Sequence, residues 1–145
     1  MENQKNDNLN LLEAVVQNTE MGKNTLEQIV PMTEDPAFRA ELLRERNLYR
    51  ELNQEPTPPS RPAAARLRAR ASCKAQHQNG HRHENAHRQI HRNLAEMLSE
   101  GSSQGVMDCI KSQKDYPDAA PGSKRLMQKL QDLEEENRLK LEQFL

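Results

Sequence analysis

The chain has 145 residues, a length that fits one domain. Only 34% of the residues are hydrophobic and 3% aromatic, with no Trp, whereas a well-packed globular core usually requires ~45–50% apolar residues. The formal net charge of -1 excludes a global electrostatic attraction to nucleic acid or to anionic lipid.

Cysteine usage and the N-terminal residues predict a soluble cytoplasmic protein. Cys73 and Cys109 form no C-x-x-C pair, so neither a disulfide framework nor a zinc knuckle is expected, and two lone thiols suit a reducing compartment. The polar first residues lack the apolar run of a signal peptide, and no stretch approaches the ~18 apolar residues of a membrane span. We therefore expect no association with membranes.

The first predicted helix runs from Leu9 to Met32, with Asp7 or Asn8 as its N-cap, because a short side-chain oxygen there satisfies a free backbone N–H. Gly22 falls on or near the apolar face, where it either permits close helix approach or is tolerated at a cost of ~1 kcal/mol. Spacings of three and four define that face as Leu12, Val15, Val16, Thr19, Leu26, Ile29 and Val30.

The second predicted helix begins at Asp35 and Pro36, since proline at the first helical position loses no useful donor. It stops near Gln54, because the prolines that begin at Pro56 cannot continue a helix. The charged residues, Glu45 among them, are expected mostly outside the apolar face. That face comprises Phe38, Leu42, Tyr49 and Leu52.

Residues 56–93 differ in composition from both flanks. This segment carries eight Lys and Arg against one acid, a formal charge of +7, so the remaining residues carry -8. It holds few large aliphatic residues, and we expect residues 55–82 to be an irregular or disordered insert within a single domain of residues 1–145. The segment also contains all five histidines, His77, His81, His83, His87 and His91.

The third predicted helix begins between His83 and Asn93 and continues through the Gly101–Gly105 stretch, because its apolar phase is kept on both sides. Its expected apolar face is Ile90, Leu94, Met97, Leu98, Val106, Cys109 and Ile110. Residues 116–123 are predicted to form a loop.

The fourth predicted helix follows this loop. Its apolar residues recur at alternating spacings of four and three, which is typical of the seam of a helical bundle. Asn137 is the one polar position in the seam, and it is expected to set the register of the helices. The seam comprises Leu126, Leu130, Leu133, Asn137, Leu141 and Phe144.

The two flanks resemble bacterial ferritin-like four-helix-bundle proteins of unknown function. The run Leu11–Gly22 is similar to that family's first helix, Asp35–Leu43 to the start of its second, Leu94–Cys109 to its third and Pro121–Leu145 to its fourth. The resemblance implies an all-α, antiparallel four-helix bundle with a disrupted, irregular central segment. Residues 56–93 match nothing in it.

The middle segment is interpreted as a frameshift product covering about residues 56–92, either natural or from sequencing error. When the codons allowed for Gln78–His91 are read from the second base, the permitted product is amphipathic and contains no forced stop. Reading Pro56–Ala63 from the third base permits a product that would extend the second helix. The reading frame would thus be offset to the third base, then to the second base, and would then return to the original frame. Three losses of one base each would produce this order of frames and restore the C-terminal frame. The encoding DNA tests this hypothesis.

The sequence offers metal ligands of two kinds. His83/His87 and His87/His91 have the i, i+4 spacing that lets two imidazoles share a zinc or nickel ion, but chance clustering in an out-of-frame segment is the favoured interpretation. The ferritin-like resemblance implies carboxylate ligands such as Glu20 and Glu100, yet the flanking helices contain no Glu-x-x-His. Most of the helical acids are expected to form a solvated face.

The sequence thus predicts an uncharacterised, non-enzymatic helical-bundle protein with no catalytic residues and no cofactor, which self-associates through exposed apolar helix faces. One alternative is a ferritin-like metal-binding protein of the di-iron or di-manganese carboxylate type. The other is a binder of nucleic acid or acidic partners through the basic segment, which is disfavoured because no aromatic residue is interleaved for base stacking. The basic residues in question are Arg61, Arg66, Arg68, Arg70 and Lys74.

Overall fold

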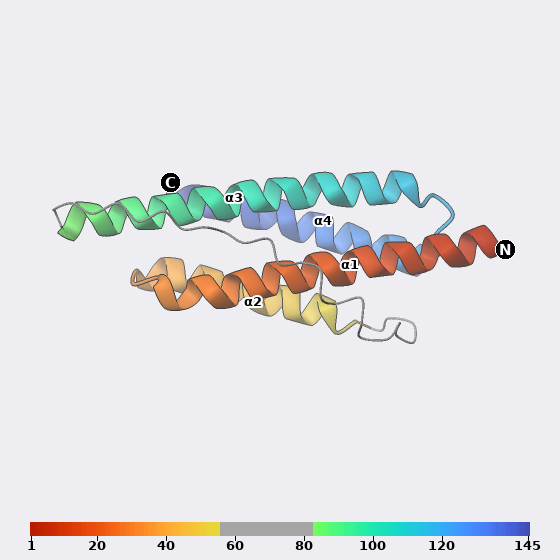
Figure 1. Cartoon of the computed structure of the whole chain (residues 1–145), viewed down its shortest axis with the longest axis horizontal. Coiled ribbons are helices and arrows are strands. Elements are labelled where there is room, and N and C mark those ends of the chain that lie inside the picture. The colour runs from red at the N-terminus through yellow and green to blue at the C-terminus, as the bar shows by residue number, and fades with distance from the viewer. Residues whose placement is uncertain (56–82) are drawn as a thin grey trace.

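The computed structural model describes residues 1–55 and 83–145, which form four long helices and no strand (Figure 1). The long helices are α1 (Glu2–Ile29), α2 (Pro36–Asn53), α3 (His83–Asp115) and α4 (Pro121–Leu141). Two short 3-10 turns, η1 (Val30–Met32) and η3 (Glu142–Phe144), extend α1 and α4. The all-α prediction is confirmed for these residues, and none of the described helices has both the length and the apolar character needed to cross a bilayer.

The helices form two pairs, α1 with α2 and α3 with α4, and within each pair the two helices run in opposite directions (Figure 1). Aromatic contacts show which ends of the two helix pairs lie together. The ring of Phe38, at the start of α2, lies 4.8 Å from that of Phe144, just after α4, and His91, near the start of α3, also contacts Phe38. The starts of α2 and α3 therefore lie together, and these two helices run in the same direction.

α1 begins seven residues earlier than predicted, so Asp7 and Asn8 are not its caps. Both lie inside the helix and satisfy backbone groups near the start of α4 instead. Asp7 accepts a hydrogen bond of 3.0 Å from the N–H of Asp118, and Asn8 accepts one of 3.3 Å from the N–H of Ala120 and another from the hydroxyl of Ser123. Ala120 has no side chain that can cap α4, and the hydrogen bonds to Asn8 instead hold the start of α4 against α1.

The predicted ends of α2 are confirmed. Asp35 is its N-cap, and a side-chain oxygen of Asp35 accepts a 2.7 Å hydrogen bond from the N–H of Phe38. The helix ends at Asn53, one residue before the predicted stop. Most of the expected insert, residues 56–82, lies outside the described residues, while Glu55 forms an ion pair of 2.8 Å with Lys129.

α3 is one uninterrupted helix, as predicted, and runs through Gly101 and Gly105. The following loop is shorter than predicted, because Pro121 is already the first residue of α4. The predicted seam of α4 is confirmed: its leucines and Asn137 are buried and Phe144 is partly buried.

The apolar face predicted for α3 is wrong in part, because it merged two faces of the helix. Ala95, Leu98 and Cys109 are buried in the core shared with α4. By contrast, Ile90 is 47% exposed and Met97 40% exposed. They are seven residues apart and so lie on one side of the helix, away from this core. Ile110 is also exposed.

Candidate functional site

Four polar side chains lie inside the bundle where α2 packs against α4. Glu45 and Tyr49 are one turn apart on α2, and Glu134 and Asn137 are one turn apart on α4. Only 2% of the Glu45 surface and 5% of the Glu134 surface is exposed, and Asn137 is fully buried. Charged side chains are almost never buried to this extent without a partner, so this buried carboxyl cluster is the candidate functional site.

Tyr49 and Glu134 form the central hydrogen bond of the cluster. The Tyr49 hydroxyl donates to Oε2 of Glu134 over 2.8 Å. Burial raises the pKa of Glu134 to about 7, although the hydrogen bonds from Tyr49 and Ser102 counteract the rise because they stabilise the carboxylate. Burial also raises the pKa of Tyr49, with Glu134 adding to the effect, so the phenol stays protonated and serves as a donor.

Glu45 lacks such a donor. Its Oε1 is buried without a hydrogen-bond partner, as is Nδ2 of Asn137. The nearest cation on its own helix, Arg44, contacts Glu41 at 2.5 Å and donates to Oδ1 of Asn137 over 3.2 Å. Burial raises the pKa of Glu45 to about 8, and the negative charge of Glu41 adds to the rise. The Glu45 side chain is therefore largely neutral at pH 7.

Two glycines let neighbouring helices approach the Tyr49–Glu134 pair. A Cβ atom at Gly22 of α1 would lie 2.7 Å from the ring of Tyr49, and one at Gly105 of α3 would lie 2.7 Å from the side chain of Glu134. Gly22 therefore permits close helix approach, which was one of the two roles predicted for it. The pair is enclosed from the α1 side and from the α3 side by residues that have no side chain to displace it.

Glu45 and Glu134 are exceptions to the prediction that most of the helical acids form a solvated face. Glu45 follows Leu42 by three residues and precedes Tyr49 by four, which places it on the apolar face of α2. Glu134 directly follows Leu133 of the α4 seam. The spacing of Glu45 from Leu42 and Tyr49 could have predicted that it lies on the apolar face. How deeply Glu45 and Glu134 are buried depends on how much of each helix its neighbour covers, and spacing along the chain does not give this.

The predicted metal candidates are not brought together. Glu20 of α1 is partly exposed and Glu100 of α3 is exposed, and both lie outside the buried cluster. His87 approaches Glu34, with 3.2 Å between Nδ1 and Oε2, whereas the ring of His91 lies 6.0 Å from that of Phe38. Among the residues that the structure describes, no three His, Cys, Asp or Glu side chains are placed to hold one metal ion. The side chain of His83 lies outside the described part.

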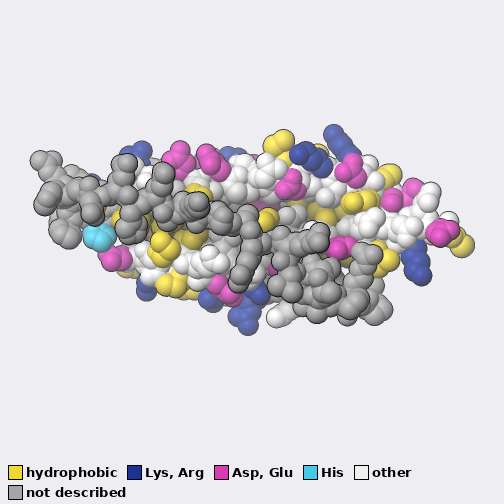
Figure 2. All heavy atoms as spheres, in the orientation of Figure 1, with side chains coloured by type: hydrophobic (Ala, Val, Ile, Leu, Met, Phe, Trp, Pro, Cys, Tyr) yellow, Lys and Arg dark blue, Asp and Glu magenta, His cyan; other side chains and the backbone are white. Residues whose placement is uncertain are grey.

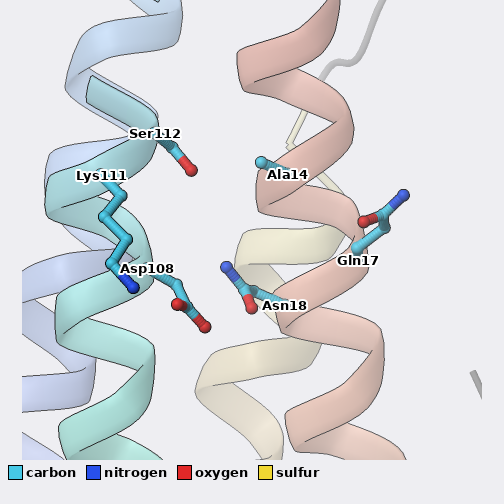
Figure 3. Close-up of a pocket in the computed structure, with 6 residues that line it drawn as sticks. All are labelled: Ala14, Gln17, Asn18, Asp108, Lys111 and Ser112. Atoms are coloured by element: carbon cyan, nitrogen blue, oxygen red, sulfur yellow. The ribbon is translucent and has the colours of Figure 1, made fainter. Parts of the chain in front are cut away.

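A second feature is an open groove between α1 and α3 (Figure 3). It has a volume of about 260 Å³, and Asn18 points into it from α1 while Asp108 and Lys111 point into it from α3. Ala14, Gln17 and Ser112 complete its lining.

The face of α1 that carries Ala14 and Asn18 continues, at spacings of three and four, to the exposed Met21. The face of α3 that carries Asp108 continues in the same way to Met97 and Ile90. Exposed apolar side chains therefore lie beyond the groove on the same faces of α1 and α3 that line it. The residues that make up this α1–α3 face are Ala14, Asn18, Met21, Ile90, Met97, Asp108 and Lys111.

The predicted basic arm, together with Cys73, His77 and His81, lies outside the described residues. Comparison of the whole chain with protein-family models, curated proteins and solved structures found no match, so its classification depends on the geometry described above.

Proposed function

We propose that this chain is a non-enzymatic helical-bundle protein of ferritin-like topology that self-associates through its α1–α3 face. The observation that carries the proposal is the groove itself, with large apolar side chains exposed along the helices that border it. Figure 2 shows yellow hydrophobic side chains along α1 and α3 on the front of the molecule, between charged residues. Large apolar side chains that are exposed on one face of a protein are candidates for contact with a partner.

The ferritin-like topology is supported by the helix directions. Two antiparallel pairs whose middle helices, α2 and α3, run in the same direction require one long connection between the pairs. Ferritin-like bundles have one such crossover, whereas a simple up-down-up-down bundle has only short loops. The 29 residues between Asn53 and His83 are enough to make it.

The non-enzymatic role is supported by the enclosure of the reactive groups. Burial raises the pKa values of Glu45, Glu134 and Tyr49, yet nearly all of the surface of these residues is covered. A substrate would have to separate α2 from α4 to reach them. The open groove holds one acid and one base, Asp108 and Lys111, without a nucleophile in hydrogen-bonding reach of a base.

A second copy of the chain is the expected partner, because the α1–α3 face carries both an acidic and a basic side chain that can pair with their opposites on another copy. Asp108 and Lys111 lie on the same face of α3, three residues apart, so the carboxylate of one copy can pair with the ammonium group of the other. Met21 and Met97 supply flexible apolar surface that adapts to a partner helix. A two-fold symmetric contact uses the same patch on both molecules, as this arrangement requires.

Sedimentation velocity over a wide concentration range tests this proposal. We expect the wild type to form a dimer whose population falls after Met97→Glu, because a charge would then be buried in the contact. Leu139→Glu is the matched control, since Leu139 is 53% exposed but lies on the outer side of α4. A wild type that remains monomeric throughout, or equal weakening by both variants, would refute the proposal. Circular dichroism of each variant checks that the helices are retained.

A further inference from the structure

Among the described contacts, no cation forms a hydrogen bond or an ion pair with either interior carboxyl, although the charges of Arg44 and Lys140 partly offset the rise in the pKa of Glu45. Arg44 is held by Glu41 and by Asn137, and its third neighbour, Glu136, also faces outward. Lys140 forms an ion pair of 2.8 Å with Glu136 on the outer side of α4. Neither cation reaches Glu45 or Glu134 with a hydrogen bond or an ion pair among the described contacts.

The helices around the buried carboxyl cluster surround it with both uncharged and charged side chains. α1 contributes the uncharged Gly22, which packs against Tyr49, and α3 contributes Ser102 as a hydrogen-bond partner of Glu134. Acidic groups act on the cluster from two helices and raise the proton affinity of the buried carboxyls. The titratable and charged groups that face Glu45 or Glu134 are Glu41, Arg44 and Tyr49 of α2, Asp108 and Cys109 of α3, and Lys140 of α4.

Neutral carboxyls fit this interior better than ionised ones, and the difference is larger for Glu45, which accepts no hydrogen bond comparable to that from Tyr49 to Glu134. A protonated carboxyl group is a donor as well as an acceptor, so it can be accommodated beside Tyr49 and Asn137. An ionised carboxylate that is buried without a cation carries a desolvation cost, and a second one nearby adds repulsion. Both costs are removed if α2 moves away from α4 and water enters.

We propose that Glu45 and Glu134 form a proton-controlled latch between the two helix pairs: α2 stays docked on α4 while both carboxyls are protonated, and the contact opens when they ionise. The ligand of this site is thus the proton. This device goes beyond the self-association proposed above and does not depend on it, because the latch lies between α2 and α4 and the groove between α1 and α3.

The pH dependence follows from proton counting. In the open state both carboxyls have their ordinary pKa of about 4.5, whereas burial raises the pKa of Glu134 to about 7 and that of Glu45 to about 8. The closed state therefore binds more protons, and its stability falls as pH rises. Opening should become up to about a hundredfold more favourable per pH unit between pH 5 and 7, about tenfold per unit between pH 7 and 8, and constant above that.

Hydrogen exchange of the α2 and α4 amides across this pH range, corrected for the intrinsic rate, measures the opening. We expect Glu45→Gln and Glu134→Gln each to remove about one proton from the pH slope, and the double variant to remove nearly all of it, because a carboxamide has the size of a neutral carboxyl and cannot ionise. Glu135→Gln is the matched control: Glu135 adjoins Glu134 in the sequence but is exposed and pairs with Arg138 at 2.8 Å. Its slope should equal that of the wild type.

Carboxyl carbon-13 shifts of the wild type give a second readout that does not require any variant to fold. The signals of Glu134 and Glu45 should titrate near pH 7 and pH 8, well above the ordinary glutamate pKa of about 4.5. Two outcomes would overturn the latch: a double variant that keeps the pH slope of the wild type, or Glu45 and Glu134 signals that are already ionised at pH 6. Self-association measured at pH 6 is unaffected by either outcome, so the two proposals fail separately.

Discussion

Substitution of Gly22 by Ala is expected to destabilise the bundle although alanine is the better helix former. The added Cβ would lie 2.7–2.9 Å from three ring atoms of Tyr49. Ordinary contacts between carbon atoms are ~3.5–4.0 Å, so either the ring or α1 has to move. The ring cannot move freely, because Tyr49 is buried and its hydroxyl donates to Glu134 over 2.8 Å.

The magnitude follows from three contributions. Overpacking a buried contact by one methyl group costs ~1–3 kcal/mol. Displacement of Tyr49 weakens its hydrogen bond to Glu134, which adds ~1 kcal/mol. Alanine has a higher helix propensity than glycine, and this difference stabilises the variant by ~1 kcal/mol. The net loss in the free energy of unfolding is therefore ~2 kcal/mol, or roughly 8 °C in Tm for a chain of this size.

Gly101→Ala supplies the control, because a Cβ at Gly101 of α3 meets nothing within 4 Å. Only the propensity gain remains, so this variant should be more stable than the wild type by ~1 kcal/mol. Urea unfolding followed by circular dichroism at constant pH compares the two. If Gly22→Ala matched or exceeded the stability of Gly101→Ala, then α1 does not press on Tyr49 and the reasoning is refuted.

Three further predictions concern single side chains. Tyr49→Phe should raise the pKa of Glu134 further above about 7, because the lost hydrogen bond lowers that pKa; a carbon-13 titration in which the pKa stays or falls would contradict this. Asp35→Ala should cost ~1 kcal/mol in urea unfolding and speed hydrogen exchange at Phe38, whereas unchanged exchange would mean that the cap is dispensable. Cys109 is fully buried, and burial raises the pKa of its thiol to about 12. In a Cys73→Ala background, a thiol reagent at pH 8 should therefore label Cys109 only as fast as the bundle opens. Rapid stoichiometric labelling would show that the thiol is accessible.

The interpretation of residues 56–92 as a frameshift product stays a prediction. α2 ends at Asn53, close to the first proposed change of frame. Residues 83–92 nevertheless form the beginning of α3, where His87 approaches Glu34 and His91 lies beside Phe38. Resequencing the gene decides the matter, since raw reads that confirm every base would exclude a sequencing error.

The sequence alone determined the local structure of this protein. The Asp35–Pro36 pair specified the start of α2 because its capping and proline geometry act within one turn. The apolar phase that continues across Gly101 and Gly105 specified one long α3, since helix periodicity does not depend on distant residues. The seam of α4 was predictable for the same reason.

Only the tertiary structure decided which residues share a site. Asn8 hydrogen-bonds to Ser123, 115 positions further along the chain, so no local pattern could show that it completes the start of another helix. Gly22 acquires its role from Tyr49, and Tyr49 from Glu134, each on a different helix. In the sequence Glu134 looks like an ordinary surface acid, and spacing alone places Glu45 on the apolar face of α2 without showing how deeply it is buried. Their pKa values rise because the packed helices exclude water from them, and periodicity records which side chains share a face but not how closely that face is covered.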